Sequence, residues 1–229
     1  MKKVWVVLLV IIGLVVVAEI SAPYLIARGL EVGLNKTLGV DVQLRLKSYP
    51  SLRMLLGQFD HISVVAKNVN LGGLSVSEYT LIAQEVDVNV RSLLGRRELT
   101  FNNQGNMEVQ VVVAEGELST YLWENIPELK GWRVQVNQGS VTVVGQAPIL
   151  NAMVDMRLQG KFVPQGADKL AFIPELLELQ NITLPQGVVD AVLQGAEFYI
   201  DLAAAPMPLE LLDVKMEPGQ LVLRAKVLQ

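Results

Sequence analysis

Few residues of this 229-residue chain have types and spacing suited to acid–base chemistry. His61 is the only histidine, and with Asp60 before it and Ser63 after it the group could form a Ser–His–Asp hydrolase site. Neighbouring residues on a strand point to opposite faces, so this spacing predicts polar residues at the start of a strand instead. Glu115 and Glu117 could act as paired carboxylates, but acidic residues just before a helix suit its dipole. We therefore expect no catalytic residues.

The composition also argues against metals, cofactors and nucleic acids. The chain has no cysteine, so disulfides, thiolate metal sites and a lipid-modified cysteine are excluded, and one histidine leaves no common zinc ligand set. The segment Leu71-Gly72-Gly73-Leu74 lacks the spacing and the lysine of a phosphate-binding loop. A net charge of −4 and the absence of a long basic tract argue against a nucleic-acid partner. We predict a non-enzymatic protein without metal or cofactor.

The N-terminal segment predicts a membrane anchor. Lys2 and Lys3 precede Val4–Ala18, which is uncharged and mostly apolar, as in a secretory signal or an uncleaved anchor. Fifteen helical residues reach only about 22 Å, and continuing to Ile26 supplies the length that a hydrocarbon layer of about 30 Å requires. A signal peptide cut after Ala22 would leave Pro23 at the new N-terminus, which is a poor context.

We therefore expect residues 1–27 to form a transmembrane signal-anchor, with a cleaved signal peptide as the alternative. The two lysines favour an N-terminus inside the cell, so residues 28–229 would form one domain on the extracytoplasmic side of the cytoplasmic membrane. If the segment is cleaved, that domain would be secreted.

The stretch Val40–Val69 shows the pattern on which the rest of the chain is built. Apolar and polar residues alternate strictly over 40–47, which predicts a strand with one buried face. Pro50 ends that pattern, and residues 52–56 fit one helical turn closed by Gly57. A second alternating strand then runs through Ile62, Val64 and Ala66.

Similar patterns continue to the C-terminus. Helices are predicted over 22–38, 117–123 and 185–194, and a hairpin joins Trp132–Val136 to Val141–Val143. Further strands are predicted over Thr80–Val90, Met107–Val113, Ala152–Val163, Leu170–Leu179, Phe198–Leu202, Leu212–Met216 and Leu221–Val227. About ten strands with few long helices indicate an α+β, β-rich fold with an extended antiparallel sheet, curled to cover its apolar face.

Several predicted strands are apolar on their second face as well. Val65, Val69, Val112, Ala114 and Val144 lie opposite the face that alternation already assigns to the core. A sheet that is apolar on both faces needs two covering layers, or one layer and an apolar ligand. Core packing alone remains the alternative to a ligand at this point.

The order of these segments resembles a known family. Leu38–Val42, Tyr49–Leu52 and Leu55–Gly57, followed by Phe59–Val64, look like the opening of the LmeA-like family of bacterial envelope proteins. The segment Gly139–Val143 and the later prolines continue the likeness over nearly the whole extracytoplasmic region. The resemblance implies phospholipid binding and a fold similar to the tubular lipid-binding (TULIP) superfamily, in which a long curved antiparallel sheet wraps a helix around an apolar groove. No catalytic residue carries over.

Together these features predict a membrane-anchored extracytoplasmic protein that binds phospholipid, or another acyl-chain lipid, in an apolar groove and supports lipid or glycolipid handling in the cell envelope. Each buried methylene would contribute about 0.8 kcal/mol. The alternative is a non-catalytic structural or assembly module of the envelope that binds a protein partner. The candidate lipid-binding residues are Val42, Leu44, Val64, Val86, Val88, Val109, Val111 and Leu158.

Overall fold

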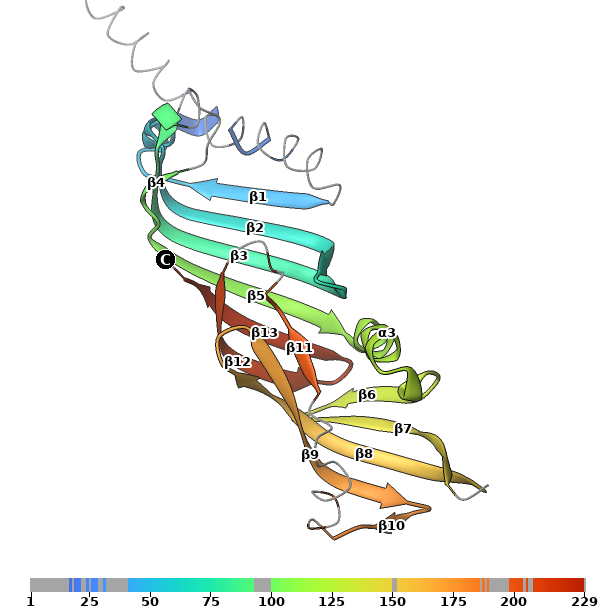
Figure 1. The fold of residues 1–229 in the computed structure, drawn as a ribbon. Coiled ribbons are helices and arrows are strands. Elements are labelled where there is room, and N and C mark those ends of the chain that lie inside the picture. The colour runs from blue at the N-terminus through green and yellow to red at the C-terminus, as the bar shows by residue number, and fades with distance from the viewer. Residues whose placement is uncertain are drawn as a thin grey trace, which may run out of the picture. The chain divides into compact units, whose positions relative to one another are not determined.

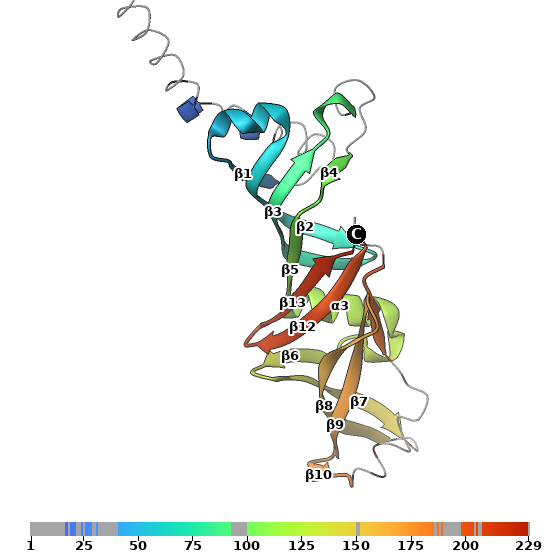
Figure 2. The same cartoon turned by 90° about the vertical axis from the view of Figure 1, so that its left-hand side faces the viewer.

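The computed structural model describes residues 41–92, 100–149, 152–185, 198–203 and 208–228, together with single positions between 17 and 31 and at 187, 189 and 205. Strands dominate this part of the chain (Figures 1 and 2). The chain divides into two compact units. Unit 1 comprises Met1–Ala66, Thr80–Glu108 and Gln229, and unit 2 comprises Lys67–Tyr79 and Val109–Leu228.

The first sheet has the strand order β1-β2-β3-β5-β13-β12, with β4 paired to β3. Its strands are β1 (Val42–Lys47), β2 (Gln58–Leu71), β3 (Leu74–Val88), β4 (Phe101–Asn103), β5 (Asn106–Ala114), β12 (Leu209–Glu217) and β13 (Gln220–Val227). The pairs β1–β2, β3–β4 and β12–β13 are antiparallel. Strands β2, β3 and β5 each contribute residues to both units.

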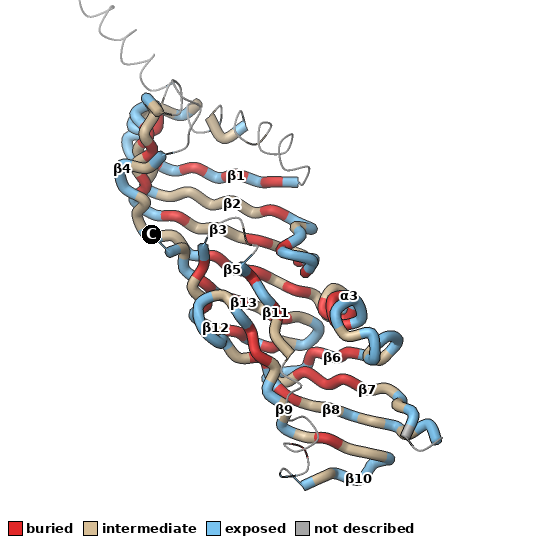
Figure 3. Tube along the Cα trace, in the orientation of Figure 1, coloured by how far each residue is buried: buried red, intermediate tan, exposed pale blue. Residues whose placement is uncertain are grey.

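The predicted strand–turn–strand segment is confirmed. Residues of β1 alternate between buried and exposed along the strand, as Figure 3 shows, and Leu44 lies opposite Val64 of β2. The 3-10 helix η1 (Ser51–Leu56) follows, and Gly57 closes it with a φ of 87°. A side chain there would be strained, and a Cβ atom would lie 2.1 Å from the Val88 carbonyl oxygen.

The second sheet lies within unit 2 and has the order β10-β9-β8-β7-β6, with β11 paired to β9. Its strands are β6 (Arg133–Asn137), β7 (Ser140–Ile149), β8 (Ala152–Gln165), β9 (Lys169–Leu179), β10 (Ile182–Thr183) and β11 (Tyr199–Asp201), all in antiparallel pairs. The predicted hairpin is β6–β7. The long strand predicted over 152–163 is β8.

The helix α3 (Glu115–Asn125) and the 3-10 helix η2 (Pro127–Leu129) connect β5 to β6. Leu118, Tyr121 and Leu122 are buried, and the 3.6-residue period places them on one face of α3. The two glutamates considered above as a carboxylate pair serve this helix. Glu117 accepts a hydrogen bond from the Ala114 N–H (2.7 Å), and Glu115 accepts one from the Val136 N–H (2.8 Å).

The β-rich fold is confirmed, with thirteen strands in the described residues where about ten were predicted. Positions 17, 19–21, 24, 26–28 and 31 are helical. Among the residues with a described placement, no helix is long and apolar enough to cross a bilayer. Most of residues 1–27, and most of the helix predicted over 185–194, lie outside that part of the chain, so the anchor stays a prediction.

Candidate functional site

Unit 2 contains an apolar cavity of about 200 Å³ that is partly open. No lining residue carries a charged or polar side chain. The lining residues are Leu122, Ile126, Leu129, Val141, Val143, Leu158, Phe162, Phe172, Pro174 and Phe198. Such a surface favours hydrocarbon, because burying an oxygen or nitrogen there would cost free energy without a compensating hydrogen bond.

The register of the second sheet brings one wall of the cavity together. Val143 of β7 lies opposite Leu158 of β8, and Phe162 further along β8 lies opposite Phe172 of β9. Leu158 and Phe162 are four residues apart on one strand, so they share a face. The residues from the end of α3 to η2 supply Leu122, Ile126 and Leu129.

An irregularity in β9 keeps its apolar residues on the cavity side. Leu177 lies opposite Leu158, whereas Pro174 lies opposite Gly160, so the strands shift by one residue between these pairs. The extra residue in β9 changes the inward-facing positions from odd-numbered Leu177 to even-numbered Pro174 and Phe172. A Cβ atom at Gly160 would lie 2.3 Å from the Ile173 carbonyl oxygen, so this close approach of the strands requires glycine.

Three phenylalanines of the lining contact one another. The ring of Phe162 meets the rings of Phe172 and Phe198 edge to face, with centroid distances of 5.3 and 6.3 Å. Phe198 makes a further edge contact with Tyr121, at 6.3 Å. Aromatic pairs in this geometry stabilise each other by about 0.5–1.5 kcal/mol beyond their burial, so they support a preformed wall.

The size of the cavity determines what it can hold. A dry apolar cavity of roughly 150 Å³ accepts benzene, whereas pockets for drug-sized ligands measure about 300–1,000 Å³. The cavity of about 200 Å³ therefore suits a segment of about eight carbons of one acyl chain. Burying that segment would contribute at most about 6 kcal/mol, and the costs of association reduce this gain.

The predicted lipid-binding residues do not form one site, because they are divided between unit 1 and unit 2. Leu158 lines the cavity, and Val109 and Val111 are buried on β5 in unit 2. The remaining five belong to unit 1, where Leu44 packs with Leu46, Met54 and Val64. Val42 is buried on β1, and Val86 and Val88 form a second cluster with Ala83.

Sequence reasoning missed most of the lining. Three of the five phenylalanines of the chain lie there, on or beside strands that were themselves predicted. The concentration of Phe162, Phe172 and Phe198 in the C-terminal half is the signal that could have located the cavity. Val65, Val69, Val112, Ala114 and Val144, the apolar second-face residues, are all half-buried.

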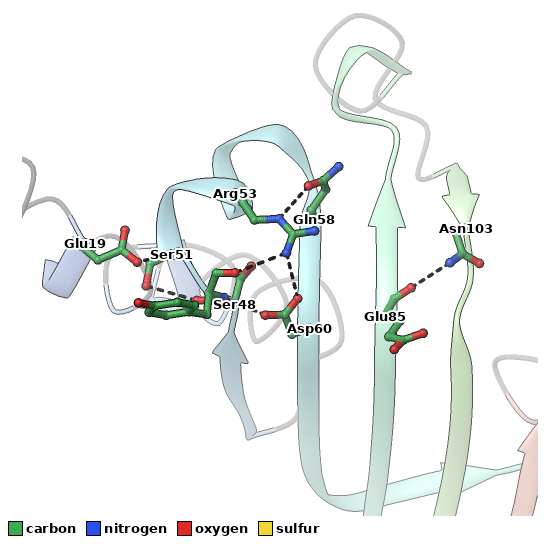
Figure 4. Close-up of polar contacts among 9 residues, drawn as sticks. Glu19, Ser48, Ser51, Arg53, Gln58, Asp60, Glu85 and Asn103 are labelled. Carbon is green, nitrogen blue, oxygen red and sulfur yellow. Dashed lines mark hydrogen bonds and ion pairs between the residues drawn. The ribbon is translucent and has the colours of Figure 1, made fainter.

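The polar residues of unit 1 are paired in structural contacts (Figure 4). Asp60 accepts a hydrogen bond from the Tyr49 N–H (2.7 Å) and forms an ion pair with Arg53 at 3.5 Å. Arg53 also donates to the Gln58 side-chain oxygen (2.9 Å). His61 lies opposite Lys47 in the β1–β2 register. Within the described ranges, no cluster of three or more His, Asp or Glu side chains is placed to hold a metal ion.

Comparison with known protein families gives one finding. The sequence model described as LmeA-like phospholipid-binding matches residues 16–226, which is nearly the whole chain. No match was found among curated proteins or among solved structures. The cavity and its lining lie within the matched residues. The chain therefore belongs to the LmeA-like phospholipid-binding family.

Proposed function

We propose that this protein is a non-catalytic lipid carrier or receptor that takes part of an acyl chain, from a phospholipid or another acyl lipid, into the apolar cavity of unit 2. The observation that carries the proposal is an all-apolar, partly open cavity of about 200 Å³ in a member of a phospholipid-binding family. In this role the protein supports lipid or glycolipid handling in the cell envelope.

The proposal includes membrane anchoring through residues 1–27, with the remaining chain on the extracytoplasmic side. Lys2 and Lys3 before the apolar run Val4–Ala18 support this orientation. Helical positions continue between 17 and 31, in line with a helix that extends beyond the apolar run.

It also includes an arrangement like that of tubular lipid-binding proteins, in which a sheet wraps a helix. Ile26 and Ala27, both at helical positions, pack against the Leu44–Leu46–Met54 cluster of unit 1. The carboxylate of Glu31 accepts a hydrogen bond from the Leu44 N–H at 2.8 Å. These contacts support a helix lying along β1.

Photo-crosslinking tests where the acyl chain lies. The full chain is reconstituted in vesicles containing a phospholipid with a diazirine in its acyl chain, irradiated, digested and mapped by mass spectrometry. We expect crosslinks on peptides from β7 to β9. Val143→Phe should reduce them severalfold, because the larger ring fills space beside Leu158. Crosslinks within residues 1–27 provide an internal reference that this substitution leaves unchanged.

Met153→Phe is the matched control, because it introduces the same ring on β8 at a residue that is 59% exposed. Leu129→Phe, at a half-buried lining position on η2, serves as a second filling variant if Val143→Phe does not fold. Crosslinks confined to residues 1–27 in the unsubstituted chain would refute acyl-chain binding in unit 2. That result would favour the assembly module with a protein partner.

A further inference from the structure

Large apolar side chains are exposed at one end of unit 1. Tyr49 is 85% exposed, and Leu55 and Leu56 of η1 are 59% and 70% exposed. Their neighbour Met54 is buried against Leu44 and Leu46. Met54 therefore holds η1 to unit 1, while Leu55 and Leu56 of η1 and the preceding Tyr49 face solvent. We call Tyr49, Leu55 and Leu56 the apolar patch.

The apolar patch lies next to the end of the N-terminal apolar segment. The carboxylate of Glu19 accepts a hydrogen bond from the Ser51 N–H at the start of η1 (Figure 4). It accepts a second from the next N–H group, that of Leu52, at 3.2 Å. Glu19 directly follows the apolar run Val4–Ala18. Consequently η1 is tied to a residue toward the outer end of the predicted anchor, close to the membrane surface.

Polar groups border the apolar patch. A hollow of about 440 Å³ is lined by Leu46, Lys47, Ser48, Tyr49, Ser51 and Asp60. The Ser48 hydroxyl is buried and has no hydrogen-bond partner among the described residues. An ammonium group, hydroxyl groups and a carboxylate beside the exposed Tyr49 match the mixture of phosphate, amine and ester groups at a phospholipid surface.

We infer that the apolar patch contacts the bilayer, with Leu55 and Leu56 at the level where headgroups meet acyl chains and Tyr49 beside them. The occupant is the surface of the membrane that holds residues 1–27, so the inference rests on the proposed anchor. Tyrosine suits this level because its ring is apolar and its hydroxyl remains hydrated. The contact would hold unit 1 at the membrane from which lipid is taken.

The absence of cysteine allows a direct test with single labels. Leu56→Cys in the full chain is labelled with an environment-sensitive nitrobenzoxadiazole dye and reconstituted in phosphatidylethanolamine/phosphatidylglycerol vesicles. We expect blue-shifted emission, severalfold stronger quenching by lipids brominated near the carbonyl, and weak quenching by aqueous iodide. Leu212→Cys on β12 is the matched control, because that leucine is 54% exposed and does not belong to the apolar patch.

The same readout separates this inference from the proposals on which it rests. A label at Val10→Cys, within the predicted span, reports whether the anchor is inserted. Iodide quenching of the Leu56→Cys label equal to that of the Leu212→Cys label would overturn bilayer contact, whatever the Val10→Cys label shows. The acyl-chain crosslinks in unit 2 test the cavity independently of either label.

Discussion

Tyr79 carries a hydroxyl into the interior of unit 2. Its side chain is buried, and among the described residues the hydroxyl has no hydrogen-bond partner. Burial raises the pKa of Tyr79 to about 12, because the phenolate would lose its hydration there. The fold therefore holds this tyrosine in its neutral form.

Stability at high pH should depend on that neutral form. The pKa of Tyr79 lies above its unfolded value of 10.0, so its contribution is complete below pH 10 and is lost as the pH rises to about 12. At pH 11, one unit above the unfolded pKa, Tyr79→Phe should remove about 1.4 kcal/mol of this loss. It should also raise the free energy of unfolding near pH 8 by about 1 kcal/mol, because no unpaired hydroxyl remains. Urea unfolding of the full chain in mild detergent at pH 8 and pH 11 measures both effects.

Tyr49→Phe is the matched control, since that tyrosine is 85% exposed and its substitution should leave stability unchanged at either pH. Tyr121, whose pKa burial also raises, stays in place in both variants. An identical loss of stability between pH 8 and pH 11 in Tyr79→Phe and the unsubstituted chain would contradict the account.

The alternation of apolar and polar residues predicted which side chains face inward, but not which of them line the cavity of unit 2. Leu158 was identified because β8 keeps its period of two through Phe162. Phe172 and Pro174 could not be placed by that period, because the extra residue in β9 changes which positions face inward. A shift of this kind depends on the pairing of two strands, and neither strand shows it alone.

Among the elements, α3 depends on its first turn. Glu117 accepts hydrogen bonds from the Ala114 N–H and from the Ser77 hydroxyl, at 2.7 and 2.8 Å. One carboxylate thus satisfies a backbone donor at the start of the helix and joins α3 to β3. The helix and its acidic start were predicted from the sequence, whereas the partner Ser77, forty residues earlier, was not.

Glu117→Ala should therefore lower the free energy of unfolding by about 1–2 kcal/mol. Glu124→Ala is the matched control, because that exposed glutamate lies near the C-terminal end of the same helix, where a negative charge gains nothing from the helix dipole. Thermal unfolding followed by circular dichroism compares the two variants. Equal effects of both substitutions would show that the contacts of Glu117 do not stabilise α3.

For the whole molecule, bound lipid should add to stability because it binds the folded chain. A ligand at one hundred times its dissociation constant contributes about 2.7 kcal/mol, which corresponds to several degrees in Tm for a chain of this length. Delipidated protein in detergent should therefore unfold at a lower temperature than protein reloaded with phospholipid. Calorimetry should show this difference for Met153→Phe and not for Val143→Phe. A full shift in Val143→Phe would place the stabilising lipid outside the cavity.

The fold class could be predicted from the sequence. Alternating segments, prolines and glycines indicated a β-rich chain, and they also carried the family resemblance. The division into two units was not, because β2, β3 and β5 contribute residues to both. Residues continuous in one strand give no local signal of such a boundary.

Strands β1 and β6 each lie at one end of a sheet, and each has a backbone N–H group that donates to a glutamate carboxylate. The Leu44 N–H on β1 donates to Glu31, and the Val136 N–H on β6 donates to Glu115. Each carboxylate occupies a donor to which a strand from another molecule would otherwise bond, and each brings a negative charge to that position. At these two positions the carboxylates therefore disfavour pairing with a strand from a second copy of the chain.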